Sequence, residues 1–454
     1  MTLISAMNPG LTGILANQKM VEITGNNIAN VNTPGYSRQT AILSPGAAIQ
    51  QRGLYIGQGV SVQEVTRAYD QFLSGQLMDQ NNVLGRESAK SGPLSEVERV
   101  FGIESDSLAQ EIESFFGAWH DLAENPSGSV EREQVLYQGE NLLDAFDHKQ
   151  SELVRITQNI NHSLEAEVNG INLRLKEIAQ LNADIKAKES NGYVAHVDHD
   201  RRDLLVKELS GILGVHEYDS GSGQVGLQLP GGLPLVQGNS AVELKSLYDG
   251  DVLHFSIKSG DVVLDAERRN FGGMFGGLLD VRDEFIPAMS AETNALRDKI
   301  ITEVNEVHAE GYGLDGVRGR DFFEIDEETG AASLAITATG HLAAGGQEGG
   351  APGDNETALA IHRLMDKKVD GETFIEHYSR IAAVVGTETR RNIMTRNGAS
   401  DTMNQLENMR ESIVGVSIEE EMINLIMFQK GFEAASRYIG TIDEMLGTII
   451  GMKR

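Results

Sequence analysis

The 454-residue sequence predicts a mainly α-helical protein with an inserted β-rich module. Apolar residues recur at helical spacing near both ends of the chain, which predicts that the terminal helices pair as a coiled coil. A further helical pattern covers 129–190 and predicts a helix about 90 Å long at 1.5 Å per residue, which suits an elongated helical body. Alternating apolar residues with glycine turns predict a small outer β domain.

The N-terminal segment predicts one helix that ends at a turn. Its apolar residues lie three and four positions apart over four heptads. Two positions of this pattern are not occupied by large apolar residues but by Gln18 and Gly25. The helix is expected to stop within 30–35, because Pro34 cannot continue it and Asn and Gly favour turns. The predicted seam consists of Ile4, Met7, Leu11, Ile14, Val21 and Ile28.

The middle of the chain changes from helical to β-rich and back. Residues 36–66 are expected to be extended, and helices are expected at about 67–90, 105–124, 129–190, 277–310 and 355–411. Within 214–275, Val225, Leu227 and Leu229 alternate with polar or small residues. Asp249-Gly250 and Ser259-Gly260-Asp261 are typical of hairpin turns, so this segment is expected to form strands.

The C-terminal segment predicts a second seam with a stricter seven-residue repeat. Glu419, Glu420 and Glu421 occupy the expected first turn and Lys453 and Arg454 the end, as the helix dipole favours. The seam consists of Ile418, Leu425, Phe428, Phe432, Ala435, Ile439, Ile442, Leu446 and Ile449. Each terminal helix alone would leave its seam in water, so each is expected to cover the other or a neighbouring copy. The alternative is that both pack on the central domain as ordinary amphipathic helices.

The charge distribution separates the two ends from the body. The net charge of the chain is −29, whereas residues 1–66 carry +1 and 418–454 carry −2, so most of the negative charge lies between them. We therefore expect a terminal domain of 1–35 plus 415–454 and a helical body of 36–213 plus 277–310 and 355–414. An outer module is expected from 214–276 plus 311–354.

Composition excludes several classes of protein. The chain has no cysteine, which excludes disulfide scaffolds, cysteine-ligated metal sites and thiol nucleophiles. The negative charge argues against nucleic acid as a partner. The sequence has no apolar run long enough to span a membrane, and its first ten residues do not resemble a cleavable signal peptide.

The sequence gives little support to an enzymatic function. His196, Asp198, His199 and Asp200 form the best candidate for a metal site, but no second cluster supports it, and a solvated loop is the favoured interpretation. His308 is expected to pack or cap within a helix. No catalytic, cofactor-binding or metal residue is therefore predicted, and a secreted acidic metal-dependent enzyme is kept as a distant alternative.

Two terminal motifs resemble those of a known family. The segment Asn27–Tyr36, NIANVNTPGY, resembles the N-terminal signature of bacterial flagellar axial proteins, which are the rod, hook and hook-associated proteins. The segments Glu420–Ile426 and Thr441–Leu446 resemble their C-terminal signature. Gly431 and Phe432 depart from the Ala-Tyr that is more frequent in the family, and a mid-helix Gly costs about 1 kcal/mol relative to Ala. The matching residues include Asn27, Asn30, Thr33, Pro34, Gly35, Tyr36, Asn424, Gln429 and Asp443.

The body is similar to one branch of that family. Phe115–Pro126, FFGAWHDLAENP, contains the only tryptophan, Trp119, and resembles the hook-associated protein at the junction between hook and filament. Segments 202–210, 276–283 and 353–359 resemble further blocks in the same order. The Trp119 block argues against the alternative of a hook or distal-rod protein.

The resemblance implies a structural component of the flagellum. It implies copies of the chain in a ring or helical layer, with hook protein below and a second hook-associated protein above. It further implies export through the flagellar type III channel, an export chaperone on the C-terminal helix, and a transient cytoplasmic stage before the protein joins the extracellular flagellum. Neither nucleic acid nor membrane is expected as a partner.

Overall fold

The computed structural model describes residues 3–51, 54–102, 107–221, 223–250, 252–260, 262–326, 329–348 and 353–452. Within these ranges the chain is mostly helical with small antiparallel sheets, which confirms the predicted fold class. Contacts divide it into two compact units. Unit 1 comprises Met1–Leu84, Val168–Gly273 and Gly398–Arg454, and unit 2 comprises Gly85–Glu167 and Met274–Asn397.

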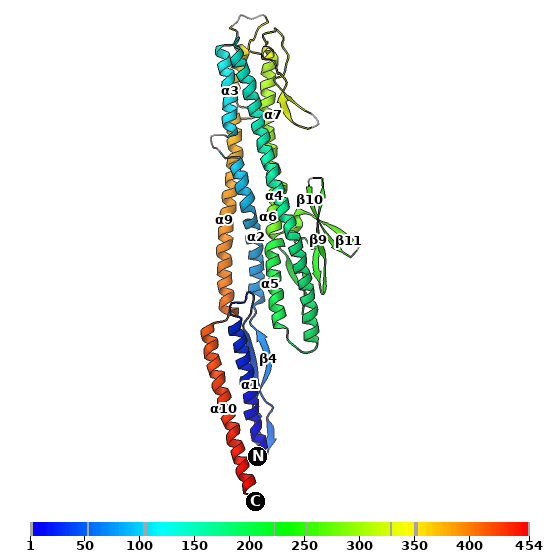
Figure 1. Ribbon diagram of the computed structural model, residues 1–454, viewed down its shortest axis with the longest axis vertical. Coiled ribbons are helices and arrows are strands. Elements are labelled where there is room, and N and C mark those ends of the chain that lie inside the picture. The colour runs from blue at the N-terminus through cyan, green and yellow to red at the C-terminus, as the bar shows by residue number, and fades with distance from the viewer. Residues whose placement is uncertain are drawn as a thin grey trace. The chain divides into compact units, whose positions relative to one another are not determined.

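The terminal helices of unit 1 pack against each other. Helix α1 (Leu3–Ala29) and helix α10 (Ile418–Gly451) run antiparallel, so the two chain ends lie at the same end of the pair (Figure 1). The hydroxyl of Tyr438 donates to the carbonyl of Ala6 over 3.1 Å, which joins the helices near the chain ends. The predicted pairing of the terminal helices is therefore confirmed.

The extended segment after α1 forms a ladder beside it. Strand β1 (Gln39–Pro45) pairs antiparallel with β4 (Val60–Arg67), and β2 (Ile49–Gln51) pairs with β3 (Leu54–Ile56). The amide of Val60 donates to the Thr12 hydroxyl on α1. Gly59 has a φ of +94° and a side chain there would collide with Thr12, so only glycine fits this contact.

The rest of unit 1 places two sheets on long helices. Parts of α2 (Gln71–Val100), α4 (Ser129–Ser190) and α9 (Phe374–Val414) belong to this unit, together with α5 (His196–Leu213). The four-stranded sheet has the order β5-β6-β7-β8 and the three-stranded sheet the order β11-β10-β9. Their strands are β5 (His216–Gly221), β6 (Gln224–Gln228), β7 (Pro234–Gln237), β8 (Ser240–Ala241), β9 (Glu243–Asp249), β10 (Val252–Ser259) and β11 (Val262–Ala266).

Unit 2 contains the remaining helices around an aromatic core. The rings of Phe115, Phe116, Trp119, Phe322 and Phe323 contact one another and are all buried. Besides parts of α2, α4 and α9, its elements are α3 (Leu108–Glu124), α6 (Gly273–Asp280), a π-helical turn (Val281–Phe285), α7 (Ile286–Glu310), β12 (Phe323–Ile325), β13 (Ala332–Leu334) and α8 (Glu356–His362).

Several predicted boundaries differ from the structure. Helix α2 continues to Val100 through Pro93, because Leu94 and Val97 are buried and their packing holds the helix together. The helix expected at 355–411 is interrupted between α8 and α9, where Asp370 and Gly371 both have positive φ and form a turn.

The predicted outer module is also divided. Most of 214–276 belongs to unit 1 and 311–354 belongs to unit 2, because the first segment packs on the C-terminal part of α4 and the second contains Phe322 and Phe323 of the aromatic core. The predicted helical body is divided likewise, since α2, α4 and α9 each contribute to both units.

The aromatic core offers a direct test of how unit 2 is stabilised. Phe115→Ala is expected to lower the free energy of unfolding by about 3–5 kcal/mol, because Phe115 is fully buried and the cavity would not collapse completely. Urea unfolding followed by the fluorescence of Trp119 measures this change. Tyr137→Ala on α4, where the side chain is exposed, is the control and is expected to change stability little. Equal effects of the two substitutions would contradict the assigned core.

Candidate functional site: the terminal helix pair and its anchor

Two glycines of α1 lie against α10. A side-chain carbon added at Gly10 would lie 2.8 Å from Ile439 and from Tyr438, and one at Gly13 would lie 3.6 Å from Ala435. On the opposite helix, Gly431 lies against Asn17. The backbones of α1 and α10 therefore approach closely along this line.

The seam predicted on α1 is partly buried in the structure. Met7, Ile14, Val21 and Ile28 are half-buried, while Leu11 is 51 % exposed. The backbone of Ile4 belongs to α1, but its side chain lies outside the described part of the molecule. Ile28 lies eighteen residues, or five full turns, after Gly10, so this seam residue shares the face on which Gly10 meets α10. The spacing identified the helix correctly, and the assignment of the whole seam to contacts between helices stays a prediction.

The seam predicted on α10 winds around the helix. A strict seven-residue repeat drifts by about 20° per heptad on a straight α-helix. Ile418 is accordingly exposed, Leu425, Phe428, Ala435, Ile439 and Leu446 are half-buried, Ile442 is buried, and Phe432 and Ile449 are exposed. Lys453 and Arg454, expected at the helix end, lie outside the described residues.

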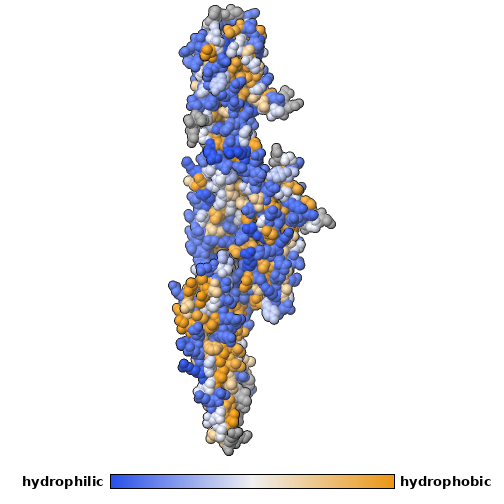
Figure 2. Space-filling model, in the orientation of Figure 1, coloured by the Kyte–Doolittle hydropathy of each residue, from blue (hydrophilic) through white to orange (hydrophobic). Residues whose placement is uncertain are grey.

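A second apolar face of α10 has no cover within the described chain. Its members lie at helical spacings of four, seven and eleven residues, and we call them the outer stripe. The outer stripe consists of Ile423, Met427, Ala434, Met445 and Met452, all of them exposed. Leu11 and Leu15 of α1 are exposed as well. Figure 2 shows hydrophobic residues gathered over the terminal helices.

Asn27 joins the end of α1 to the first strand. Its side-chain amide donates to the carbonyl of Gln39 and accepts from the amide of the same residue, at 2.9 and 3.0 Å. The amide also donates to Glu421 at 3.2 Å, and its oxygen accepts from the hydroxyl of Tyr36 at 2.8 Å. Every hydrogen-bonding capacity of this buried amide is used, so no other residue type would serve equally.

Glu421 joins the same point to the start of α10. Its carboxylate is only 2 % exposed and lies 2.8 Å from the guanidinium of Arg38, which also reaches Glu420 at 3.1 Å. The amide of Arg38 donates to the carbonyl of Val414 at the end of α9. Burial of an unpaired carboxylate would be costly, and Arg38 and Asn27 together remove that cost. We call Asn27, Tyr36, Arg38 and Glu421 the latch.

Residues 30–38 connect α1 to β1, and we call them the linker. A second group of charges anchors the linker on α5. The amide of Ser37 donates to Asp200 at 3.1 Å, and Arg67 bridges Asp200 and Asp203 at 2.8 Å each. Since Ser37 lies between two latch residues, the latch and α5 are connected through one short stretch of chain. Sequence reasoning noticed Asp200 only as a possible metal ligand and missed this anchoring role.

The remaining polar side chains of that segment are occupied by protein partners. His196 donates to the carbonyl of Val65, His199 pairs with Glu189 at 2.7 Å, and Asp198 pairs with Lys188 at 2.5 Å. No group of three or more His, Asp or Glu that could hold a metal is present in the described ranges. The segment opens α5 and is not the solvated loop that the sequence favoured.

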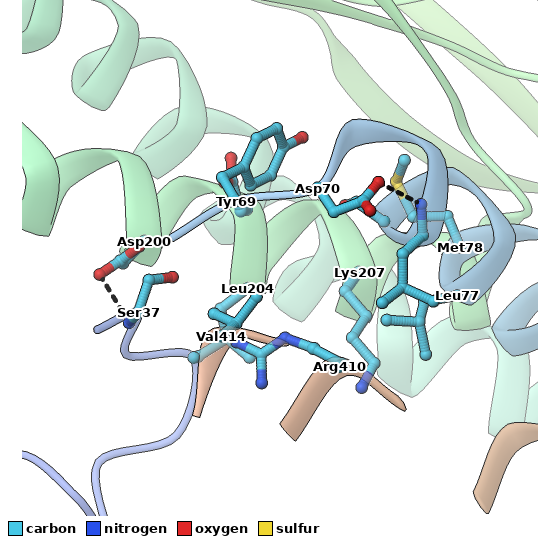
Figure 3. A pocket seen from close by; sticks show the side chains of 14 residues that line it. Ser37, Tyr69, Asp70, Leu77, Met78, Asp200, Leu204, Lys207, Arg410 and Val414 are labelled. Atoms are coloured by element: carbon cyan, nitrogen blue, oxygen red, sulfur yellow. Dashed lines mark hydrogen bonds between the residues drawn. The ribbon is translucent and has the colours of Figure 1, made fainter. Parts of the chain in front are cut away.

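A small cavity lies between the linker and the helices of unit 1. Its volume is about 100 Å³, and Figure 3 shows Ser37 bonded to Asp200 at one side, with Leu204, Lys207, Val414 and Arg410 around it. A neighbouring recess of about 190 Å³ lies between the turn 30–36 and the end of α9. Two hollows therefore adjoin this segment of unit 1.

The other motif residues have distinct positions. Asn30 accepts from the Thr33 hydroxyl within the turn, and Gly35 has a φ of +82° and lies against Leu204 of α5. Pro34 is exposed. On α10, Asn424 is half-buried while Gln429 and Asp443 are exposed. Trp119 is fully buried in the aromatic core of unit 2 and is therefore a core residue rather than part of the terminal site.

Family models match three parts of the chain. The model described as flagellar hook-associated protein FlgK helical domain matches residues 94–323, just over half of the chain. The chain belongs to the flagellar hook-associated protein FlgK family. The flagellar basal body rod protein model matches 7–36, and the flagellar basal body rod FlgEFG protein C-terminal model matches 411–452, so both terminal motifs lie in matched segments.

Known proteins of the FlgK family resemble the chain over most of its length. Flagellar hook-associated protein 1 of Bacillus subtilis is 27% identical over 96% of this chain and 95% of its own length. The Salmonella typhimurium protein of the same name is 30% identical over 71% of this chain and 59% of its own length. A solved structure, the flagellar hook junction protein FlgK from Burkholderia pseudomallei, shares the fold with a TM-score of 0.66 at 15% identity, covering 74% of this chain and all of that one.

Membership of the FlgK family makes the chain a structural protein of the extracellular flagellum, where it assembles with hook and filament components. It is not an enzyme, because its relatives are structural hook-associated proteins. The FlgK match over 94–323 also separates it from the hook and distal-rod alternative. No helix within the described ranges is long and apolar enough to cross a membrane.

The latch is expected to weaken at high pH. Burial, with the negative charges of Asp200 and Glu421 nearby, raises the pKa of Tyr36 to about 12. Because the pKa of an unfolded tyrosine is about 10, the stability linked to the neutral phenol is complete below pH 10 and is lost as the pH rises towards 12. The urea midpoint of the wild type should therefore fall more between pH 10 and 12 than that of Tyr36→Phe. Tyr55→Phe, at an exposed side chain, is the control and should behave as the wild type.

Proposed function

We propose that copies of this chain pack side by side through α1 and α10 and form the junction between hook and filament. The observation that carries the proposal is the outer stripe of α10, an apolar face at regular helical spacing that the described chain does not cover. A monomeric helix packed on its own domain would turn such residues inward.

The energetics of the outer face favour association. Burying a large aliphatic side chain contributes about 1.5–3 kcal/mol. The outer stripe offers Ile423 and three methionines, and α1 offers Leu11 and Leu15. A helix of one copy that covered the stripe of the next would therefore gain several such contributions, whereas an isolated copy gains none.

The charge of the chain fits an arrangement with the ends inside. The terminal segments are nearly neutral, so they can lie close together in many copies, while the acidic middle part would repel its neighbours and stay in solvent. The same acidic surface would keep single copies soluble before they assemble.

Membership of the family supports a proposal for the neighbours and for the route of export. The hook protein would lie below this layer and a second hook-associated protein above it. Before assembly, a chaperone that covers the outer stripe in the cytoplasm would prevent premature association, and the chain would then leave through the flagellar type III channel. The absence of cysteine suits passage of an unfolded chain, since no disulfide can obstruct it.

A charge placed on the covered face should prevent assembly. Leu425→Asp or Ile439→Asp would bury an unpaired carboxylate between α1 and α10, so incorporation into flagella should fall at least tenfold. Immunoblots of purified flagella measure incorporation, and Trp119 fluorescence shows whether unit 2 remains folded. Arg437→Asp, on the exposed polar side of α10, should incorporate normally. Normal incorporation of both seam variants would contradict the proposal.

Deletion of the gene in its own host tests the junction itself. We expect electron micrographs to show hooks without filaments. The filament protein should appear in the medium because the hook would lack the junction on which it assembles. Expression of the wild-type chain from a plasmid should restore filaments. Normal filaments in the deletion strain, with no second copy of the gene, would refute the junction role.

A further inference from the structure

Two of the three methionines of α10, Met427 and Met445, lie on the outer stripe, and the third, Met422, is 44 % exposed. Met427 and Met445 are each 55 % exposed and lie eighteen residues apart, which is five full turns of an α-helix, so their side chains occupy the same face. Met452, which follows the helix, is 83 % exposed. By contrast, Met403 on α9 is only 5 % exposed. Thioethers are thus presented to solvent on the face to which assembly has been assigned.

We propose that Met427 and Met445 are sites of reversible oxidation, and that their oxidation by a peroxide before assembly prevents a copy from being incorporated. The sulfur attacks one oxygen of hydrogen peroxide, the O–O bond breaks, an S–O bond forms and water leaves. The thioether is oxidised to a sulfoxide by two electrons and the peroxide is reduced. A methionine sulfoxide reductase reverses the step at the expense of a dithiol.

The neighbours of these residues on α10 offer a sulfoxide few hydrogen bonds once the outer stripe is covered. A sulfoxide oxygen needs a hydrogen-bond donor when it is removed from water. One turn either side of Met445, the hydroxyls of Thr441 and Thr448 already donate to backbone carbonyls. Near Met427, the ammonium of Lys430 is paired with Glu433 at 3.0 Å. Apart from the remaining N–H groups of Lys430, a covered sulfoxide would find no free donor among these neighbours, so it would lose hydrogen bonds to water that they do not fully replace.

The unoxidised side chains suit the opposite purpose. Methionine is flexible and polarisable, so it adapts to more than one apolar partner. A stripe that is covered first by a chaperone and later by a neighbouring copy needs that adaptability, and thioether chemistry makes the same stripe sensitive to oxidants. This inference rests on the proposed function, since it requires that the outer stripe be covered during assembly.

The test compares incorporation of reduced and oxidised protein. Purified full-length chain is treated with hydrogen peroxide, and peptide mass spectrometry measures sulfoxide at each methionine. Both samples are added to hook–basal bodies from a strain that lacks the gene, and bound protein is quantified. We expect oxidised wild type to bind at least fivefold less, treatment with methionine sulfoxide reductases to restore binding, and Met403 to remain largely reduced.

Variants assign the effect to the outer stripe. The double substitution Met427→Leu with Met445→Leu keeps the face apolar, so binding after peroxide should stay within twofold of the untreated sample. Met394→Leu, at a 68 % exposed position of α9 in unit 2, should leave the sensitivity unchanged. Equal binding of oxidised and reduced wild type, or unchanged sensitivity in the double variant, would overturn the inference. Loss of the proposed function itself is recognised separately, because Leu425→Asp would then bind as well as the wild type without any peroxide.

Discussion

The buried carboxylate of Glu421 is the constraint on which the terminal domain depends. A charge that is 2 % exposed is tolerated only if its partners are already in place, and they come from two other segments: Asn27 at the end of α1 and Arg38 just before β1. The start of α10 can therefore dock only where α1 has ended and turned. The register of the helix pair, the position of β1 and the connection to α5 through Ser37 all follow from that single meeting point.

Asparagine solves the same geometric problem at four places in the chain. A strand has backbone N–H and C=O groups that need partners, but the backbone groups in the middle of a helix are already paired. A helix can therefore bond to a strand only through its side chains. The amide of Asn27 pairs with both backbone groups of Gln39, and Asn172, Asn182 and Asn305 do the same for Leu244, Val225 and Phe323. Each of these four sheets is short, and an asparagine side chain from a long helix completes its hydrogen bonding. The small sheets are thereby fixed to helices without long strands of their own.

The sequence predicted the elements better than the faces by which they meet. Periodicity identified both terminal helices and α4, because large apolar residues dominate that signal. It could not show that Gly10, Gly13 and Asn17 lie against α10, since glycine and asparagine carry no hydrophobic signal. The sequence pattern did contain a sign of the Asn182 contact, because Asn182 is a polar residue between Ile178 and Ile185 on the apolar face of α4. Asp200 was expected in a solvated loop, because the sequence alone does not show that Arg67 lies beside it.

The division of α1 and α10 into small and large faces has a functional consequence. Close packing through glycine and alanine allows one chain to hold its two ends together with little apolar surface. Under the proposed function, the large residues that stay exposed would contact other copies, where each burial adds to the stability of the assembly rather than to that of the single chain. If Gly10 and Gly13 were leucines, the helices would be forced apart, and the Tyr438 contact with Ala6 would be lost. The glycine contact within one chain and the proposed apolar contact between chains therefore use different faces of the helices. The latch fixes the orientation of α10 and so determines which face is exposed.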